Sequence, residues 1–261
     1  MGQIGAIFAF GLVCASVFVN GWTDAPNAIA TVVSTRVLSP RAAVLLATVF
    51  NLVGVVCFGT AVASTIANLV DIGTGREALI AVAAAQLSIV IWALSAWRYG
   101  IPTSESHALI AGLMGAGIAY RGMAAFRWNE FQKVLLGLLI STAVGFVAAY
   151  FVTKAVAFLF RGVKRKKANR IFSAGQIGSA ALMAMSHGAQ DGQKFMGVMV
   201  LVMLLAQGFP VPETVHIDLW VMLLCSFIMA LGTSIGGYRI IKTMGVDMVK
   251  LEKYQGFSAE V

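Results

Sequence analysis

Long apolar segments alternate with short polar stretches along the chain. The apolar segments lie at residues 4–20, 42–70, 77–99, 108–120, 131–160, 171–185, 195–207 and 217–235. An α-helix rises about 1.5 Å per residue, so a bilayer core of roughly 30 Å needs about 20 apolar residues for one crossing. The pattern predicts an all-α, polytopic membrane protein with about seven to nine crossings.

Three polar interruptions differ from ordinary loops because their apolar flanks place them at membrane depth. They are residues 20–27, 100–107 and 186–194. Within the first, Gly21 and Pro26 would break a helix. Non-helical backbone inside a membrane is tolerated only where protein buries it or water solvates it. We therefore expect broken or re-entrant helices at all three interruptions, and one or more internal sites.

The composition excludes several classes of protein. Of the 261 residues, 59% are hydrophobic and only 11% are charged, and the mean hydropathy is +0.86. A soluble domain carries about 25% charged residues, so a soluble enzyme, a disordered chain and a nucleic-acid-binding module are excluded. The net charge of +8 arises mainly in residues 161–170, which hold six of the 19 Lys and Arg residues. We interpret this decapeptide as a cytoplasmic loop that obeys the positive-inside rule.

The distribution of basic residues also predicts the orientation. No Lys or Arg precedes Arg36, and residues 208–216 contain none, whereas the C-terminal tail is basic. The positive-inside rule then places the N-terminus outside the cell, and the 161–170 loop and the C-terminal tail in the cytoplasm. Residues 1–160 must cross the membrane an odd number of times, and five crossings fit their apolar segments.

A sequence repeat supports this odd number of membrane crossings. Gly21-Trp-Thr-Asp24 and Gly188-Ala-Gln-Asp191 both read Gly-x-x-Asp at the end of an apolar segment. An odd number of crossings between them inverts the second copy, and inverted repeats with broken helices are typical of secondary transporters. We expect a first transmembrane repeat at 1–160, the basic loop at 161–170, and a second repeat at 171–261.

Three acidic residues are candidates for a cation or proton site. A carboxylate at the centre of a membrane helix costs about 2.5–3.5 kcal/mol on insertion scales, so Asp24 and Asp191 require a purpose. One interpretation is a carboxylate pair, contributed by the two repeats, that binds a coupling cation, with Glu105 as a further partner. The alternative is that each Asp caps the half-helix that follows its break.

Hydroxyls and amides near these acids are candidates for an anion site. Ser104 and Ser106 precede a Gly-rich segment, and hydroxyls at a helix N-terminus bind anions, although ordinary capping of that helix is the alternative. Asn27, Gln190 and Gln193 supply neutral amides that suit an oxyanion or the coordination shell of a cation.

The histidines and one lysine leave alternatives open. His107 and His187 could relay protons or could be structural hydrogen-bonding groups. Lys194 could neutralise an anion or one of the aspartates, or its stem could lie along apolar surface with the amine in water.

Several motifs in order resemble the PiT inorganic phosphate transporters. The sequence NGWTDAPNA at 20–28 resembles the family's first signature, G-A-N-D-x-x-N-A, with Trp22-Thr23 in place of Ala-Asn. SHGAQDGQK at 186–194 resembles the second signature, with Gln190 in place of Asn. PTSESH at 102–107 is similar to the family's P-x-S-x-[ST]-H element, and residues 236–245 and 253–257 resemble its cytoplasmic stretch. The likeness covers nearly the whole chain.

The resemblance implies symport of inorganic phosphate across the inner cell membrane, driven by a sodium or proton gradient, and no enzymatic activity, cofactor, resident metal or nucleic-acid partner. The substrate is phosphate alone or a complex with a divalent metal; lipid surrounds the protein, and a homodimer is one alternative for its assembly. Cotransport of cations is also expected on electrostatic grounds, because moving each negative charge of hydrogen phosphate inward against 100 mV costs about 2.3 kcal/mol. The chain has no G-x-x-x-x-G-K-[ST] motif for ATP.

An intramembrane enzyme is the alternative function. It would use Asp24, Asp191, His107 and His187 as acid–base or metal-binding groups, although no H-E-x-x-H motif is present.

The spacing of the two repeats leads to one further expectation about the length of the chain. Ser104 follows Asp24 by 80 residues, and the same interval after Asp191 falls near position 271, past Val261. We therefore expect the second repeat to be incomplete and the chain to be C-terminally truncated.

Overall fold

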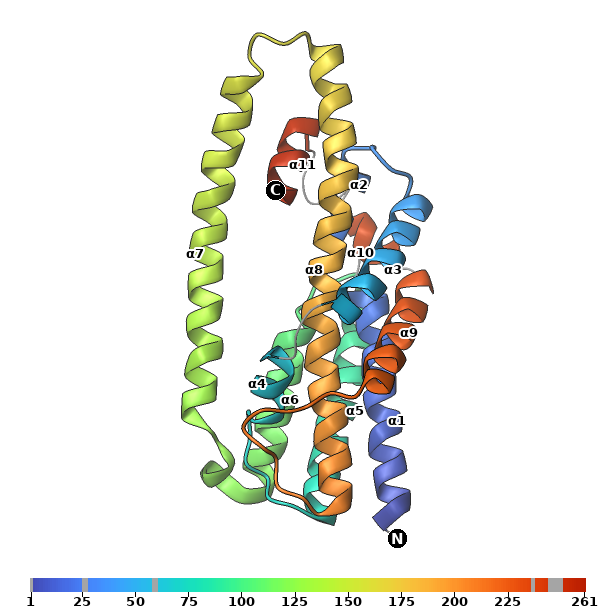
Figure 1. Ribbon diagram of the computed structural model, residues 1–261, viewed down its shortest axis with the longest axis vertical. Helices are drawn as coiled ribbons and strands as arrows, with labels where there is room; N and C mark the ends of the chain where they lie inside the picture. Colours follow the sequence, from blue (N-terminus) through green and yellow to red (C-terminus); the bar gives the residue numbers. More distant parts are fainter. Residues whose placement is uncertain (1, 25–27, 58–60, 236–237, 244–250) are drawn as a thin grey trace.

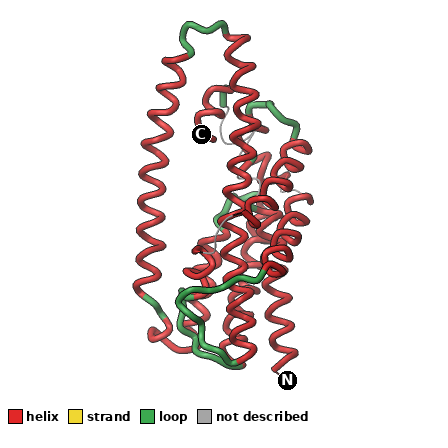
Figure 2. The backbone as a smooth tube through the Cα atoms, in the orientation of Figure 1, coloured by secondary structure: helices red, strands yellow, loops and turns green. Residues whose placement is uncertain are grey.

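The computed structural model describes residues 2–24, 28–57, 61–235, 238–243 and 251–261 (Figure 1). Its elements are α1 (Gly2–Thr23), α2 (Ala30–Ser34), α3 (Pro40–Cys57), α4 (Ala61–Ala67), α5 (Arg76–Tyr99), α6 (Glu105–Arg121), the 3-10 helix η2 (Gly122–Ala125), α7 (Trp128–Leu159), α8 (Arg165–Gln207), α9 (Leu219–Ile235), α10 (Tyr238–Lys242) and α11 (Lys253–Glu260). The described residues form no β-strand (Figure 2), which confirms the all-α class.

Among the described residues, five helical stretches are long and apolar enough to cross a membrane. They are Ile4–Thr23, Pro40–Cys57, Arg76–Tyr99, Glu105–Ala125 and Trp128–Leu159. All five lie within residues 1–160, the number that the sequence predicts for this part of the chain. On α7 none of the residues in the most apolar window is buried, and a bilayer is the solvent in which such a surface is stable. The chain is a multi-pass membrane protein.

The helices are interrupted at two of the three predicted places. The prediction that Gly21 breaks the first helix is wrong, because α1 continues through Gly21 and ends at Thr23, and α2 begins at Ala30. Pro26, the other predicted helix breaker, lies outside the described residues. Helix α5 ends at Tyr99, where Gly100 adopts a left-handed φ of 68° that closes the helix. The chain is then non-helical until α6 begins at Glu105.

The predicted break at residues 186–194 is wrong, because α8 runs through this segment without interruption. The segment contains glycines but no proline, so every residue can keep its backbone hydrogen bond inside the helix. With 43 residues, α8 is about 65 Å long. The basic loop at 161–170 is also shorter than expected, because α8 already begins at Arg165.

Helices α1 and α9 cross at two glycines that face each other's backbone. A Cβ atom at Gly21 would lie 2.3 Å from the carbonyl oxygen of Met229, and one at Gly232 would lie 2.1 Å from that of Phe18. Any side chain larger than hydrogen at either position would collide with main chain. The two helices therefore approach more closely than other residues allow.

Helices α8 and α3 cross in the same way. A Cβ atom at Gly188 would lie 2.2 Å from the carbonyl oxygen of Asn51, and one at Gly54 would lie 1.9 Å from that of Met185. The contact residues of the two crossings are related by constant sequence intervals. Each α1 position, 18 or 21, is followed 167 residues later by its equivalent on α8, at 185 or 188. Each α3 position, 51 or 54, is followed 178 residues later by its equivalent on α9, at 229 or 232. In Figure 1, α1 and α8 run in opposite directions. The two crossings are thus one arrangement, used twice with inverted direction.

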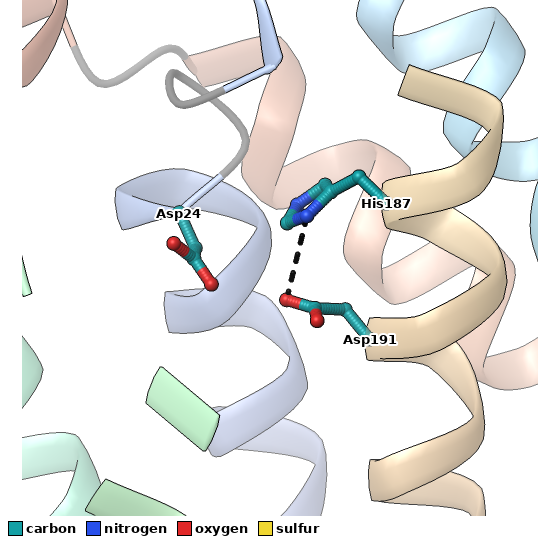
Figure 3. A group of neighbouring side chains, drawn as sticks. All are labelled: Asp24, His187 and Asp191. Atoms are coloured by element: carbon teal, nitrogen blue, oxygen red, sulfur yellow. Dashed lines mark ion pairs between the residues drawn. The ribbon is translucent and has the colours of Figure 1, made fainter. Parts of the chain in front are cut away.

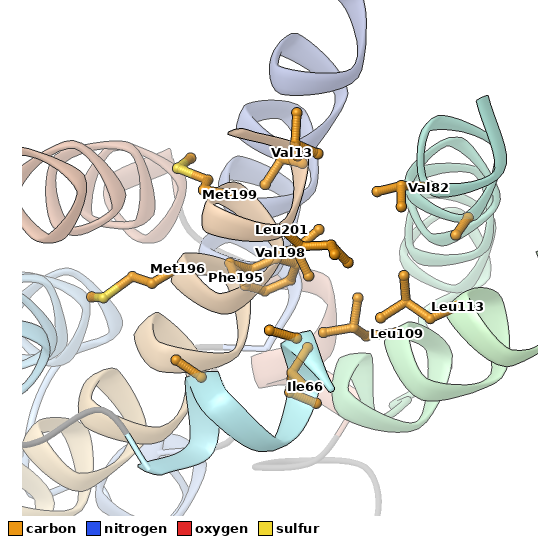
Figure 4. Close-up of a cluster of buried hydrophobic side chains, with 14 of the residues drawn as sticks. Val13, Ile66, Val82, Leu109, Leu113, Phe195, Met196, Val198, Met199 and Leu201 are labelled. Carbon is orange, nitrogen blue, oxygen red and sulfur yellow. The ribbon is translucent and has the colours of Figure 1, made fainter. Parts of the chain in front are cut away.

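Of the three apolar clusters among the described residues, the two larger ones pack against the middle part of α8. The larger, shown in Figure 4, joins Val13 of α1 and Phe195 of α8 to Ile66, Val82 and Leu109 of α4, α5 and α6. The smaller joins the segment after α1 to α3 and α8, and includes Ile29, Val32, Ala47, Ala184 and Ile241. The polar residues at the end of α1 and in the middle of α8 lie between these two clusters.

Helix α11 is held against α8 and α2 by a buried carboxylate. Ser179 Oγ donates a hydrogen bond of 2.7 Å to Glu260 Oε2, and the Thr31 hydroxyl donates to the same carboxylate. Lys253 Nζ also donates to Ser173 Oγ at 2.8 Å. These contacts connect the C-terminal helix to the segment that follows the first interruption.

Candidate functional site

The end of α1, the start of α6 and the middle of α8 bring four ionisable side chains together. Asp24 directly follows α1, Glu105 opens α6, and Asp191 and Lys194 lie one turn apart on one face of α8. Their exposed fractions are 8%, 1%, 6% and 3%. We call these four residues the charged cluster. Because charges are rarely buried without a partner, it is the strongest candidate site among the described residues.

Asn20 connects the two repeat-related aspartates. Its amide Nδ2 donates to Asp191 Oδ2 at 3.0 Å and to Asp24 Oδ2 at 3.4 Å. His187 Nδ1 lies 3.7 Å from Asp191 Oδ2, and Asp24, His187 and Asp191 each offer one ligand atom within 4.8 Å of the others (Figure 3). Carboxylate oxygens at this spacing suit a hard cation.

Lys194 neutralises Asp191 directly. Its Nζ lies 2.9 Å from Asp191 Oδ2, and it donates to Ser106 Oγ of α6 at 2.9 Å. A side chain this well paired and this deeply buried does not extend to water, so of the alternatives left by the sequence the pairing with an aspartate is correct and the exposed amine is excluded.

Glu105 is held by the end of α1. Thr23 Oγ1 donates to Glu105 Oε1 at 3.1 Å. The acidic residue of the second interruption therefore lies against the end of α1, which directly precedes Asp24. Three carboxylates and one ammonium group share this buried region.

The PTSESH element splits between two surfaces. Ser106 contacts the charged cluster through Lys194. Ser104 instead caps α6, since its Oγ accepts from the His107 backbone N–H at 3.3 Å. Ser104 and His107 line a separate groove of about 670 Å³ between α5 and α6, together with Trp92 and Ser88. The structure therefore brings Ser106 into the cluster and leaves Ser104 and His107 outside it.

The predicted amides are also separated. Gln193 is buried, and its Oε1 accepts from the Val62 backbone N–H at 3.1 Å. Gln190 lies on an exposed face of α8, where its Nε2 donates to Ser186 Oγ at 3.3 Å. Asn27 lies outside the described residues.

The interpretation as a helix cap is wrong for Asp191, and Asp24 is not the N-cap of α2. The N-cap of α2 is Ile29, with no side-chain cap, and Asp191 lies in the middle of α8. Asn20, which donates to both aspartates, belongs to the candidate site but was not predicted from the sequence. The signal was its position four residues before Asp24, which places both side chains on one helical face.

Comparisons with known proteins point to one family. The family described as the phosphate transporter family matches residues 20–166 and 160–261. A probable low-affinity inorganic phosphate transporter of Bacillus subtilis is 40% identical over 245 residues, which cover 94% of this chain and 73% of the relative. A protein of the same description from Rhizobium meliloti is 40% identical over 244 residues, covering 93% and 72%. For one from Mycobacterium tuberculosis, 40% identity over 249 residues covers 93% of this chain but 58% of the relative.

One solved structure has the same fold. It is described as the sodium-dependent phosphate transporter, and it superposes with a TM-score of 0.88 over 98% of this chain and 82% of that chain. The sequences are 23% identical. The likeness extends over all the helices that bound the charged cluster.

Proposed function

Because the chain belongs to the phosphate transporter family, we propose that it is a symporter that moves inorganic phosphate across the cell membrane together with sodium ions or protons. The observation that carries this proposal is the charged cluster, in which Asp24, Glu105 and Asp191 are buried where α1, α6 and α8 meet. Buried carboxylates inside a membrane protein are typical of cation and proton pathways.

Coupling cations bind among these carboxylates. Asp24 and Asp191 lie on either side of Asn20, which donates to both, and Glu105 adds a third carboxylate from α6. His187, beside Asp191, is the better placed of the two histidines for a proton relay, since His107 faces the α5–α6 groove. The sodium-dependent description of the solved neighbour supports sodium as the first cation to test.

Phosphate binds beside the cluster. Ser106 is within hydrogen-bonding distance of Lys194, so its hydroxyl and the start of α6 are well placed for an anion. Gln193 and Asn27 supply amide groups from the two signature segments. Ser104 and Gln190 would join this site only after a change in their present positions, because they face other surfaces.

We also propose the arrangement of the chain in the membrane. Residues 1–160 and 171–261 form the two repeats, with the basic 161–170 segment between them. The N-terminus is external, and the basic segment and the C-terminal tail face the cytoplasm of a cell with this protein in its inner membrane. A metal–phosphate complex as substrate and a homodimer as assembly belong to the same proposal.

The intramembrane enzyme is not favoured. The curated relatives are described as phosphate transporters, and His107 is separated from the charged cluster that an acid–base mechanism would need. One feature therefore distinguishes the two functions experimentally. A transporter accumulates phosphate, whereas an enzyme converts its substrate.

Uptake of radioactive phosphate into proteoliposomes tests the proposal. The protein is reconstituted, a sodium or proton gradient is imposed, and uptake is followed with sodium present and absent, across a series of pH values, with and without magnesium. We expect phosphate to accumulate only when the gradient of the coupling cation is present. A phosphate-derived product without accumulation, or equal uptake with no gradient, would contradict symport.

Replacing Ser106 with alanine should raise the phosphate concentration that gives half-maximal uptake about tenfold, with a smaller effect on the maximal rate. A hydrogen bond to a charged partner contributes roughly 1.5–3 kcal/mol. Ser104→Ala is the matched control: it removes a helix cap, which costs about 1 kcal/mol of stability, and should leave the half-saturation concentration unchanged. An equal increase in both variants would place phosphate in the α5–α6 groove instead.

A further inference from the structure

The two repeat-related signatures differ in one charge. The 167-residue interval that joins the glycine crossings also joins Asp24 to Asp191. Three residues after each aspartate, the same 167-residue interval relates Asn27 to Lys194. The second signature therefore carries a cation at the position where the first carries a neutral amide.

The contacts of Lys194 assign this extra charge to Asp191. Its Nζ is 2.9 Å from Asp191 Oδ2 and 2.9 Å from Ser106 Oγ. The groups that face the pair are Asn20 at the end of α1 and Asp24 directly after it, Glu105 and Ser106 from α6, and His187 from α8 itself. The cluster thus contains three carboxylates and one resident ammonium group.

We propose that Lys194 is a tethered counter-ion that takes the place of one coupling cation at Asp191. This inference rests on the proposed phosphate symport. In a buried site, each uncompensated charge is costly, so a carboxylate that loses its internal partner must take up an external cation or a proton. The two aspartates, although related by the repeat, are therefore not equivalent, and the protein moves one cation fewer per phosphate than a site with asparagine at both positions.

Three variants test the proposal. Lys194→Asn gives the second signature the same residue as the first and leaves Asp191 without its ammonium partner. Lys194→Arg is the matched control, because it keeps the charge. The double variant Asp191→Asn/Lys194→Asn removes both charges of the pair together.

The measured quantity is the number of charges moved per phosphate. Proteoliposomes are loaded with a fixed phosphate gradient, the membrane potential is set with potassium and valinomycin, and the potential at which net phosphate flux vanishes is determined. This potential counts charge whether the cation is sodium or a proton. We expect Lys194→Asn to move one more positive charge per phosphate than the unchanged protein, and Lys194→Arg to move the same number.

An unchanged count in Lys194→Asn overturns the proposal. So does a double variant that still binds the extra cation in detergent, because that cation would then not be bound at Asp191. If Lys194→Asn does not transport, cation binding in detergent decides: one additional cation per chain supports the charge pairing, and an unchanged number contradicts it.

A binding measurement separates this inference from the proposed function. Purified protein in detergent is equilibrated with radioactive sodium, and proton uptake is titrated in parallel. We expect Lys194→Asn to bind one more cation per chain than the unchanged protein. If the unchanged protein accumulates no phosphate, the symport proposal fails, while the cation count still decides whether Lys194 replaces a bound cation.

Discussion

Replacing Asp24 with asparagine should abolish coupled phosphate uptake while leaving a folded, membrane-inserted protein. Asparagine has nearly the same shape and can still pair with the Asn20 amide, which lies 3.4 Å from Asp24 Oδ2, but it removes the negative charge that a cation requires. Loss of one partner of a buried charge pair costs about 3–5 kcal/mol. We therefore expect cation affinity, and uptake with it, to fall more than a hundredfold.

Uptake in proteoliposomes measures the loss of transport, and thermal unfolding in detergent measures whether the variant is still folded. Asp71→Asn is the matched control, because Asp71 is exposed and its ion pair with Arg121, at 3.1 Å, is at the surface, where such pairs contribute little. Normal uptake by Asp24→Asn would remove this carboxylate from the cation site. If Asp24→Asn fails to fold and Asp71→Asn folds, the role of Asp24 is structural.

Gly188→Ala should destabilise the protein by about 3 kcal/mol, near the upper end of the effects of overpacking. The new Cβ atom would lie 2.2 Å from the carbonyl oxygen of Asn51, and a main-chain oxygen cannot rotate away as a side chain does. Helices α8 and α3 would have to separate, which would also displace Asp191 from Asn20.

Thermal unfolding with Gly178→Ala as control tests this expectation. Gly178 lies on the same helix, and a Cβ atom there would meet nothing within 4 Å. Alanine at Gly178 should leave stability unchanged or raise it by up to about 1 kcal/mol, because glycine is the weaker helix former. Equal melting temperatures for the two variants would show that the α8–α3 crossing tolerates a wider spacing.

The hydropathy pattern was sufficient to predict the helical class and the five spans before residue 160, because a bilayer imposes both the length and the polarity of its helices. It was not sufficient at residues 186–194. There the sequence shows polar residues at membrane depth but not that Asp191 and Lys194 neutralise each other one turn apart. That mutual pairing lets a continuous helix carry both charges where we expected a break.

The sequence also predicted only part of the candidate site, because the direction of a side chain depends on the residue at which its helix begins. Asp24, Asp191 and Glu105 were identified because a buried carboxylate is costly wherever it lies. The separation of Ser104 from Ser106 depends on the residue at which α6 begins, since each helical residue turns the side chain by about 100°. A hydropathy pattern does not locate that residue, and Ser104 is the N-cap only because the helix begins at Glu105.

The unbroken course of α8 has a mechanical consequence. Asp191 and Lys194 are fixed on one rod that extends from Arg165 to Gln207, so a tilt or a rotation of that rod carries both charges together and keeps them paired. Asp24 has a different attachment, because it lies where α1 stops and a separate short helix, α2, starts at Ala30. The distance between Asp191 and Lys194 is therefore set within one helix, whereas the distance between Asp191 and Asp24 depends on how α1 is placed against α8.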